Sequence, residues 1–108
     1  MEKTDVVSAL AALAHETRLD IFRLLVQTGP EGLPAGQIAE RLALASPTAA
    51  FHLKELKIAG LVSCTRQGRS LIYAAAYPAM TALVTYLTEN CCGQQVAHMP
   101  LCCPAIPA

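Results

Sequence analysis

The most constraining feature of the sequence is a pair of short helical patterns separated by only three residues, Ala43-Leu44-Ala45. In LPAGQIAERL, residues 33–42, apolar residues recur at the i, i+3, i+4 and i+7 spacing of one helix face. In SPTAAFHLKELKIA, residues 46–59, Ser46 is the expected N-cap, Pro47 suits the first turn, and a second apolar stripe follows. Two helices joined by so short a link are typical of a helix-turn-helix unit.

The flanking segments predict the remaining elements. We expect further helices over residues 5–14, over residues 16–28 and from Pro78 to near Gly93, and strands over residues 61–66 and 69–75. Gly68 supplies the positive φ that a tight hairpin needs. The predicted fold is therefore mainly α with a β-hairpin wing, a winged helix-turn-helix. Its second paired helix is expected to enter a DNA major groove.

Two of the flanking helices carry apolar stripes. The first stripe is Val6, Leu10, Leu13 and Ala14, and the last is Met80, Leu83, Val84 and Leu87. Continuing the last stripe by one helical step leads to Cys91. The chain is 54% hydrophobic and 15% charged, which is apolar for 108 residues. We therefore expect part of this surface in a subunit interface, although alanine inflates the count.

Charge is distributed unevenly along a chain whose net charge is zero. Residues 41–70 carry five basic side chains against Glu55 alone, whereas residues 1–40 carry three basic against six acidic. Residues 71–108 carry only Glu89. Positive charge is thus concentrated where the second paired helix and the hairpin are predicted, as contact with phosphates requires.

Three segments together resemble the ArsR/SmtB family of winged helix-turn-helix metalloregulatory repressors. ALAALAHETRLDIFRLL is similar to the family's opening helices, LASPTAAFHLKELKIAGLV to its recognition helix, and RQGRSLIYAAA to its wing. The resemblance implies a homodimer built on the first and last helices. It also implies operator binding by the metal-free form and release when metal binds. We expect residues 1–93 to form the DNA-binding and dimerisation domain and residues 94–108 a cysteine-containing tail.

Candidate DNA contacts come from the second paired helix and the wing. Helical spacing directs positions 47, 51, 54 and 58 away from the core, and the wing tip carries two arginines. The predicted contacts are Ser46, Thr48, Phe51, His52, Lys54, Lys57, Arg66, Gln67 and Arg69.

Two of these residues each have two possible roles. Phe51 could pack on a thymine methyl group or be an ordinary exposed apolar side chain. His52 lies nearer the core flank than the groove face, and matches a histidine common at this position in the family. It is therefore either a packed, hydrogen-bonded residue or a DNA contact.

The tail carries adjacent cysteine pairs in a CC-x₉-CC pattern: Cys91, Cys92, Cys102 and Cys103. Neither of the family's common sensing sites carries over, because EGLPAGQIAERL has no cysteine and PAMTALVTYLTEN offers only Glu89. Thiolates select soft metals and metalloids, and trivalent arsenic and antimony bind three of them in a pyramid. We therefore expect As(III) or Sb(III) as the inducer, held by Cys91, Cys92 and one of the second pair. His98 is either an accessory ligand or an ordinary loop residue.

Other functions are compatible with the same cysteines. The same cysteines could respond to Cd, Zn or Pb, or could oxidise to a disulfide as a redox sensor. An enzyme is not expected, because no CX₅R-type loop is present and no arginine follows Arg69. Cys64 is expected to be structural. The polar first five residues, and apolar runs far below the roughly 18 residues of a membrane span, predict a cytoplasmic protein with operator DNA as its partner and no membrane contact.

Overall fold

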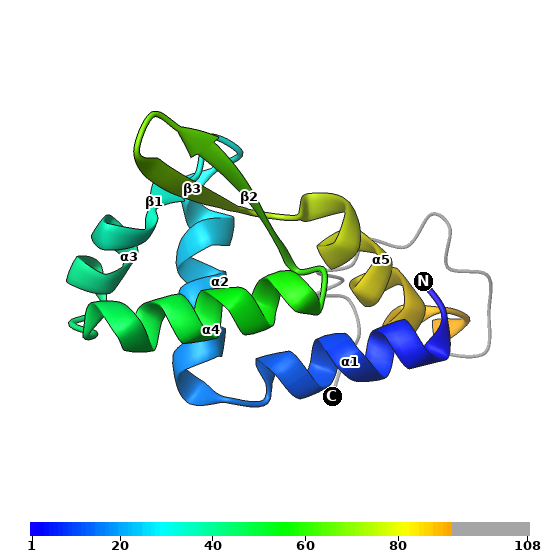
Figure 1. The fold of residues 1–108 in the computed structure, drawn as a ribbon. Coiled ribbons are helices and arrows are strands. Elements are labelled where there is room, and N and C mark those ends of the chain that lie inside the picture. Colours follow the sequence, from blue (N-terminus) through cyan, green and yellow to red (C-terminus); the bar gives the residue numbers. More distant parts are fainter. Residues whose placement is uncertain (92–108) are drawn as a thin grey trace.

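The computed structural model describes residues 1–91, which form a group of helices with a small antiparallel sheet at one edge (Figure 1). The elements are α1 (Lys3–Leu13), α2 (Glu16–Thr28), β1 (Leu33–Pro34), α3 (Ala35–Arg41), α4 (Ser46–Ile58), β2 (Val62–Gln67), β3 (Ser70–Ala75) and α5 (Tyr77–Thr88). The predicted winged helix-turn-helix is confirmed, with α3 and α4 as the helix pair and β2–β3 as the wing.

The core is built mainly around α2 and α4. The largest fully buried side chains are Ile21, Leu25, Ile38, Leu53, Leu56 and Leu61. They come from α2, α3, α4 and the residue that leads into β2. Each such aliphatic side chain contributes roughly 1.5–3 kcal/mol on burial, so this cluster fixes α4 against the rest of the domain.

The turn between α3 and α4 is tight. Ala43 adopts a left-handed conformation with φ of 55°, and the Leu44 N–H donates to the Ala39 carbonyl at 2.8 Å. Ala45 occupies the N-cap of α4 and Ser46 is the first helical residue, so the predicted cap by Ser46 is wrong by one position. The Ala45 carbonyl accepts the first helical bond, from the Ala49 N–H at 3.0 Å.

The predicted apolar stripe of α1 is only partly buried in the core. The helix buries Val6, Ala9 and Ala12, whereas Leu10 is exposed and Leu13 only packs against the edge of the core. The small side chains of Ala9 and Ala12 allow α1 to approach its neighbours closely. The larger side chains of α1 are thereby left on its outer face.

The wing is a two-residue hairpin. Its strands pair from Val62↔Ala75 to Gln67↔Ser70, one residue later in the first strand than predicted. Gly68 has φ of 62°, as expected for the first position of such a turn. The turn presents the predicted side chains of Arg66, Gln67 and Arg69 to solvent.

A third strand, β1, was not predicted. Its two residues pair with β3, Leu33 with Tyr73 and Pro34 with Ile72, in the strand order β1-β3-β2. Gly32 precedes it with φ of 72°, and a Cβ at this position would collide with the Tyr73 carbonyl. The close approach ties the start of α3 to the base of the wing.

The last helix is shorter than predicted. It ends at Thr88, Glu89 is extended, and Asn90 adopts a left-handed φ of 58°. Asparagine tolerates this conformation and commonly ends helices, so the chain turns before Cys91. Cys91 therefore does not continue the stripe of Leu83 and Leu87. In residues 1–91, no helix is long and apolar enough to span a membrane.

Candidate nucleic-acid interface

Helix α4 has one buried face and one open face. Ala49, His52, Leu53 and Leu56 are buried against the core. The predicted contacts Ser46, Thr48, Phe51, Lys54 and Lys57 are all exposed. The helix therefore offers solvent a surface that combines hydroxyl groups, ammonium groups and one aromatic ring.

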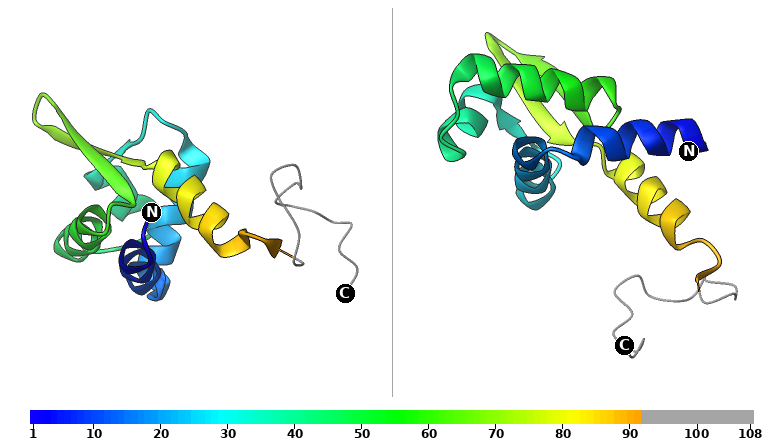
Figure 2. Two further views of the ribbon diagram at one scale, coloured as in Figure 1. Left: turned by 90° about the vertical axis from the view of Figure 1, so that its right-hand side faces the viewer. Right: turned by 90° about the horizontal axis from the view of Figure 1, so that it is seen from below.

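The wing lies on the same side of the molecule as α4. Figure 2 (left) shows both elements together on one side, while α5 leads away on the other. Arg66 and Arg69 on the wing and Lys54 and Lys57 on α4 are all exposed, so both elements carry basic side chains that solvent can reach. A helix that enters a groove and a basic hairpin that reaches the neighbouring backbone can both contact one duplex in this arrangement.

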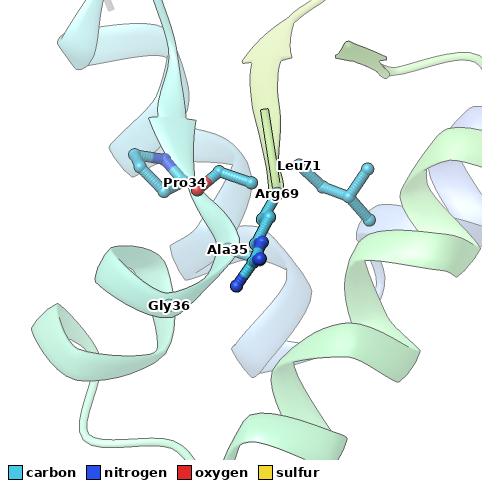
Figure 3. A pocket seen from close by; sticks show the side chains of 6 residues that line it. Pro34, Ala35, Gly36, Arg69 and Leu71 are labelled. Carbon is cyan, nitrogen blue, oxygen red and sulfur yellow. The ribbon is translucent and has the colours of Figure 1, made fainter. Parts of the chain in front are cut away.

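Arg69 also borders a cavity between the wing and the start of α3. The cavity, of about 310 Å³, is lined by Pro34, Ala35, Gly36, Arg69, Ser70 and Leu71. Figure 3 shows the Arg69 side chain extending from the wing toward Ala35. This position suits a guanidinium that reaches a phosphate from the edge of the interface.

His52 lies behind the groove face. It is only 7% exposed, and its Nδ1 accepts a hydrogen bond from Arg18 Nε at 3.2 Å. Its ring also packs on the His15 ring, with centroids 4.6 Å apart. Of the two roles left open by the sequence, the structure favours the packed, hydrogen-bonded one.

Burial lowers the pKa of His52 below its ordinary value, and nearby His15 and Arg18 lower it further. Glu55 opposes these effects by raising the pKa. His52 is therefore neutral at pH 7, as its acceptance of the Arg18 hydrogen bond requires.

The supporting role of Arg18 and His15 was not predicted. Both lie at the start of α2, where the His15 side chain also caps the helix by accepting from the Thr17 N–H at 3.2 Å. The sequence signal for the cap was present, since a side-chain acceptor stands just before the helix. The contact with His52 spans 34 residues and depends on how α2 packs against α4.

The predicted thiol site falls mostly outside the described residues. Cys91 is partly buried just beyond α5, whereas Cys92, Cys102 and Cys103, with His98, lie outside residues 1–91. Within residues 1–91, no three histidine, cysteine, aspartate or glutamate side chains come together to hold a metal ion.

Cys64 has a structural setting in the wing. It faces Tyr73 across the β2–β3 pair. Burial raises the pKa of Tyr73, and a hydrogen bond with Cys64 raises it further.

Known proteins share this architecture. A family profile described as a helix-turn-helix domain matches residues 13–65. An ArsR-like transcriptional regulator from Rhodococcus sp. RHA1 is 30% identical with a TM-score of 0.70, over 80% of this chain and 78% of that one. The homodimeric winged helix-turn-helix DNA-binding domain of a possible ArsR-family regulator from Mycobacterium bovis is also 30% identical, with a TM-score of 0.66 over 82% of each chain.

The chain belongs to the ArsR family. A curated relative, the uncharacterized HTH-type transcriptional regulator YceK of Bacillus subtilis, is 37% identical over 59 residues. This match covers 55% of the present chain and 58% of the length of that relative. The resemblance predicted from the sequence is therefore confirmed at the level of family and fold.

Proposed function

We propose that this ArsR-family protein is a homodimeric transcriptional repressor that binds operator DNA through α4 and the wing. In the proposal, the protein releases DNA when As(III) or Sb(III) binds thiolates of the C-terminal cysteines. The observation that carries the DNA-binding part is the shared surface of α4 and the wing. These two elements lie on one side of the molecule (Figure 2), and Lys54, Lys57, Arg66 and Arg69 are exposed on them.

The outer face of α1 supports the homodimer. Val7 and Leu10 are exposed on α1, and Leu87 is exposed on α5. Exposed leucine and valine side chains on neighbouring helices are stabilised when a second copy covers them. A two-fold axis through this surface would present two α4 helices to a palindromic operator, with half-sites about one helical turn apart.

The selection of DNA from a random pool tests this part. The protein is expected to enrich duplexes with two inverted half-sites, because the symmetry of a dimer is mirrored in its site. Recovery of no preferred sequence, or of a single unpaired half-site, would contradict the proposal.

The metalloid-sensing part of the proposal rests on the chemistry of the C-terminal thiols. Cys91, Cys92, Cys102 and Cys103 gather four thiols within 13 residues, and three thiolates complete the coordination of As(III). The tail follows α5, so metalloid binding there can bias a dimer arrangement that includes this helix. The inducer must bind the low-affinity arrangement more tightly, and DNA must weaken inducer binding by the same factor.

A panel of inducers tests the sensing part. Release of a fluorescent operator duplex is measured with As(III), Sb(III), Cd(II) and Zn(II), and with diamide as a thiol oxidant. Wild-type protein should release DNA with As(III) or Sb(III), and the variant with all four tail cysteines changed to serine should not. Cys64→Ser is the matched control and should respond like wild type.

The other outcomes distinguish the alternatives. A response to Cd(II) or Zn(II) alone would replace the metalloid by a divalent metal. Release by diamide alone, without metal, would favour a redox sensor. A quadruple serine variant that still responds to As(III) would place the sensor elsewhere.

A further inference from the structure

Phe51 stands out on the open face of α4. Its side chain is 54% exposed on the surface that otherwise carries Thr48 and Lys54. An aromatic ring on this face loses little water-accessible area within the free domain. The ring becomes buried in an apolar environment only when an apolar group of another molecule covers it.

The Phe51 ring contacts a buried neighbour. It packs edge-on against the His52 ring, with centroids 5.3 Å apart and an interplanar angle of 65°. His52 is itself buried, bonded to Arg18 and packed on His15. This contact with a buried ring favours one orientation of Phe51, so the open face of α4 presents an apolar ring at one place.

The major groove offers one kind of apolar group at a base edge, the methyl group on C5 of a pyrimidine. Every other base edge there presents a hydrogen-bonding group, which phenylalanine cannot satisfy and would cut off from water. We infer that Phe51 is a specificity-determining residue that selects a C5-methylated pyrimidine, thymine or 5-methylcytosine, at one position of each half-site. The inference rests on the proposed function, in which α4 enters the major groove.

Methyl scanning of a selected duplex tests the inference. Each thymine is replaced singly by deoxyuridine, which removes the methyl group and leaves the hydrogen-bonding edge intact. Affinity is measured by fluorescence anisotropy. At one thymine of each half-site, the replacement should weaken binding roughly fourfold, the effect expected from one buried methyl-sized group. At that position, 5-methylcytosine should bind more tightly than cytosine by a similar factor.

Protein variants assign the effect to the ring. Phe51→Ala should bind the thymine and deoxyuridine duplexes equally, and Phe51→Leu should keep part of the difference. Ile58→Ala is the matched control, because Ile58 is 70% exposed and lies seven residues later on the same helix face. It should discriminate like wild type, since it lies about 10 Å further along the helix.

The outcomes are distinct from those of the proposed function. Wild-type binding that ignores every thymine methyl group would overturn the inference and leave DNA binding intact. So would Phe51→Ala that still discriminates while its thermal unfolding matches wild type. Failure to enrich any duplex would overturn the proposed function, and the inference with it.

Discussion

His52 shows how a polar residue of α4 can be held within the protein instead of facing solvent. It spans the space between α4 and the start of α2, where Arg18 and His15 meet it. The sequence placed it on the core flank, and the structure explains why a polar residue is tolerated there. Its acceptor atom is satisfied by a donor that could not be identified from sequence spacing.

The lowered pKa of His52 predicts a pH dependence of stability. Because the unfolded chain binds a proton at His52 more readily than the folded one, the free energy of unfolding should fall as pH drops below about 6.5. One proton limits the slope to about 1.4 kcal/mol per pH unit. Urea unfolding of wild type and His52→Gln between pH 7.5 and 5 measures it. The variant should show a flatter profile, and an equally steep one would remove His52 as the source.

Helices and strands were predicted well where the sequence pattern that specifies them is local. They were predicted poorly where they depend on packing between distant segments. The α3–α4 pair and the hairpin follow from apolar spacing and from Gly68, both local properties. The face of α1 does not, since Ala9 and Ala12 are buried for their small size. β1 has only two residues, one of them proline, and exists because β3 lies beside it.

The junction before β1 gives a prediction at the scale of an element. Gly32→Ala forces a left-handed alanine and a clash with the Tyr73 carbonyl, so it should destabilise the fold by at least about 2 kcal/mol. Gly36→Ala in α3 is the matched control, because a Cβ there meets nothing within 4 Å. It should leave stability unchanged or raise it by up to about 1 kcal/mol. Thermal unfolding measures both, and equal effects would refute the role of the β1–β3 approach.

The end of α5 is another feature that apolar spacing alone did not predict. The apolar spacing alone extended the predicted helix to Cys91, whereas the backbone leaves the helix at Glu89 and turns at the left-handed Asn90. The exposure of Thr48, Phe51 and Lys54 on α4 was predictable from helical spacing, and so was the position of His52 on the core flank. The predicted set of thiol ligands rests on the chemistry of cysteine, since three of its four residues lie outside residues 1–91.

At the scale of the whole molecule, the exposed face of α1 predicts assembly. Leu10→Glu places a charge in the proposed dimer surface, so the variant should sediment as a monomer and lose most of its operator affinity. Leu19→Glu on α2 is the matched control, because Leu19 is 42% exposed and Leu10 41%. It should remain dimeric. Analytical ultracentrifugation distinguishes them, and dimers of both variants would place the interface elsewhere.

The central claim is that α4 and the wing bind DNA through phosphates and base edges, and the salt dependence of binding tests it most directly. Operator affinity is measured over a series of salt concentrations for wild type, Arg69→Ala and Lys3→Ala, the last a basic residue at the start of α1. Loss of one phosphate contact per subunit should reduce the slope of log affinity against log salt by about 1.8 in Arg69→Ala. Lys3→Ala should keep the wild-type slope. A wild-type affinity that does not change with salt, or a slope unchanged in Arg69→Ala, would contradict the account.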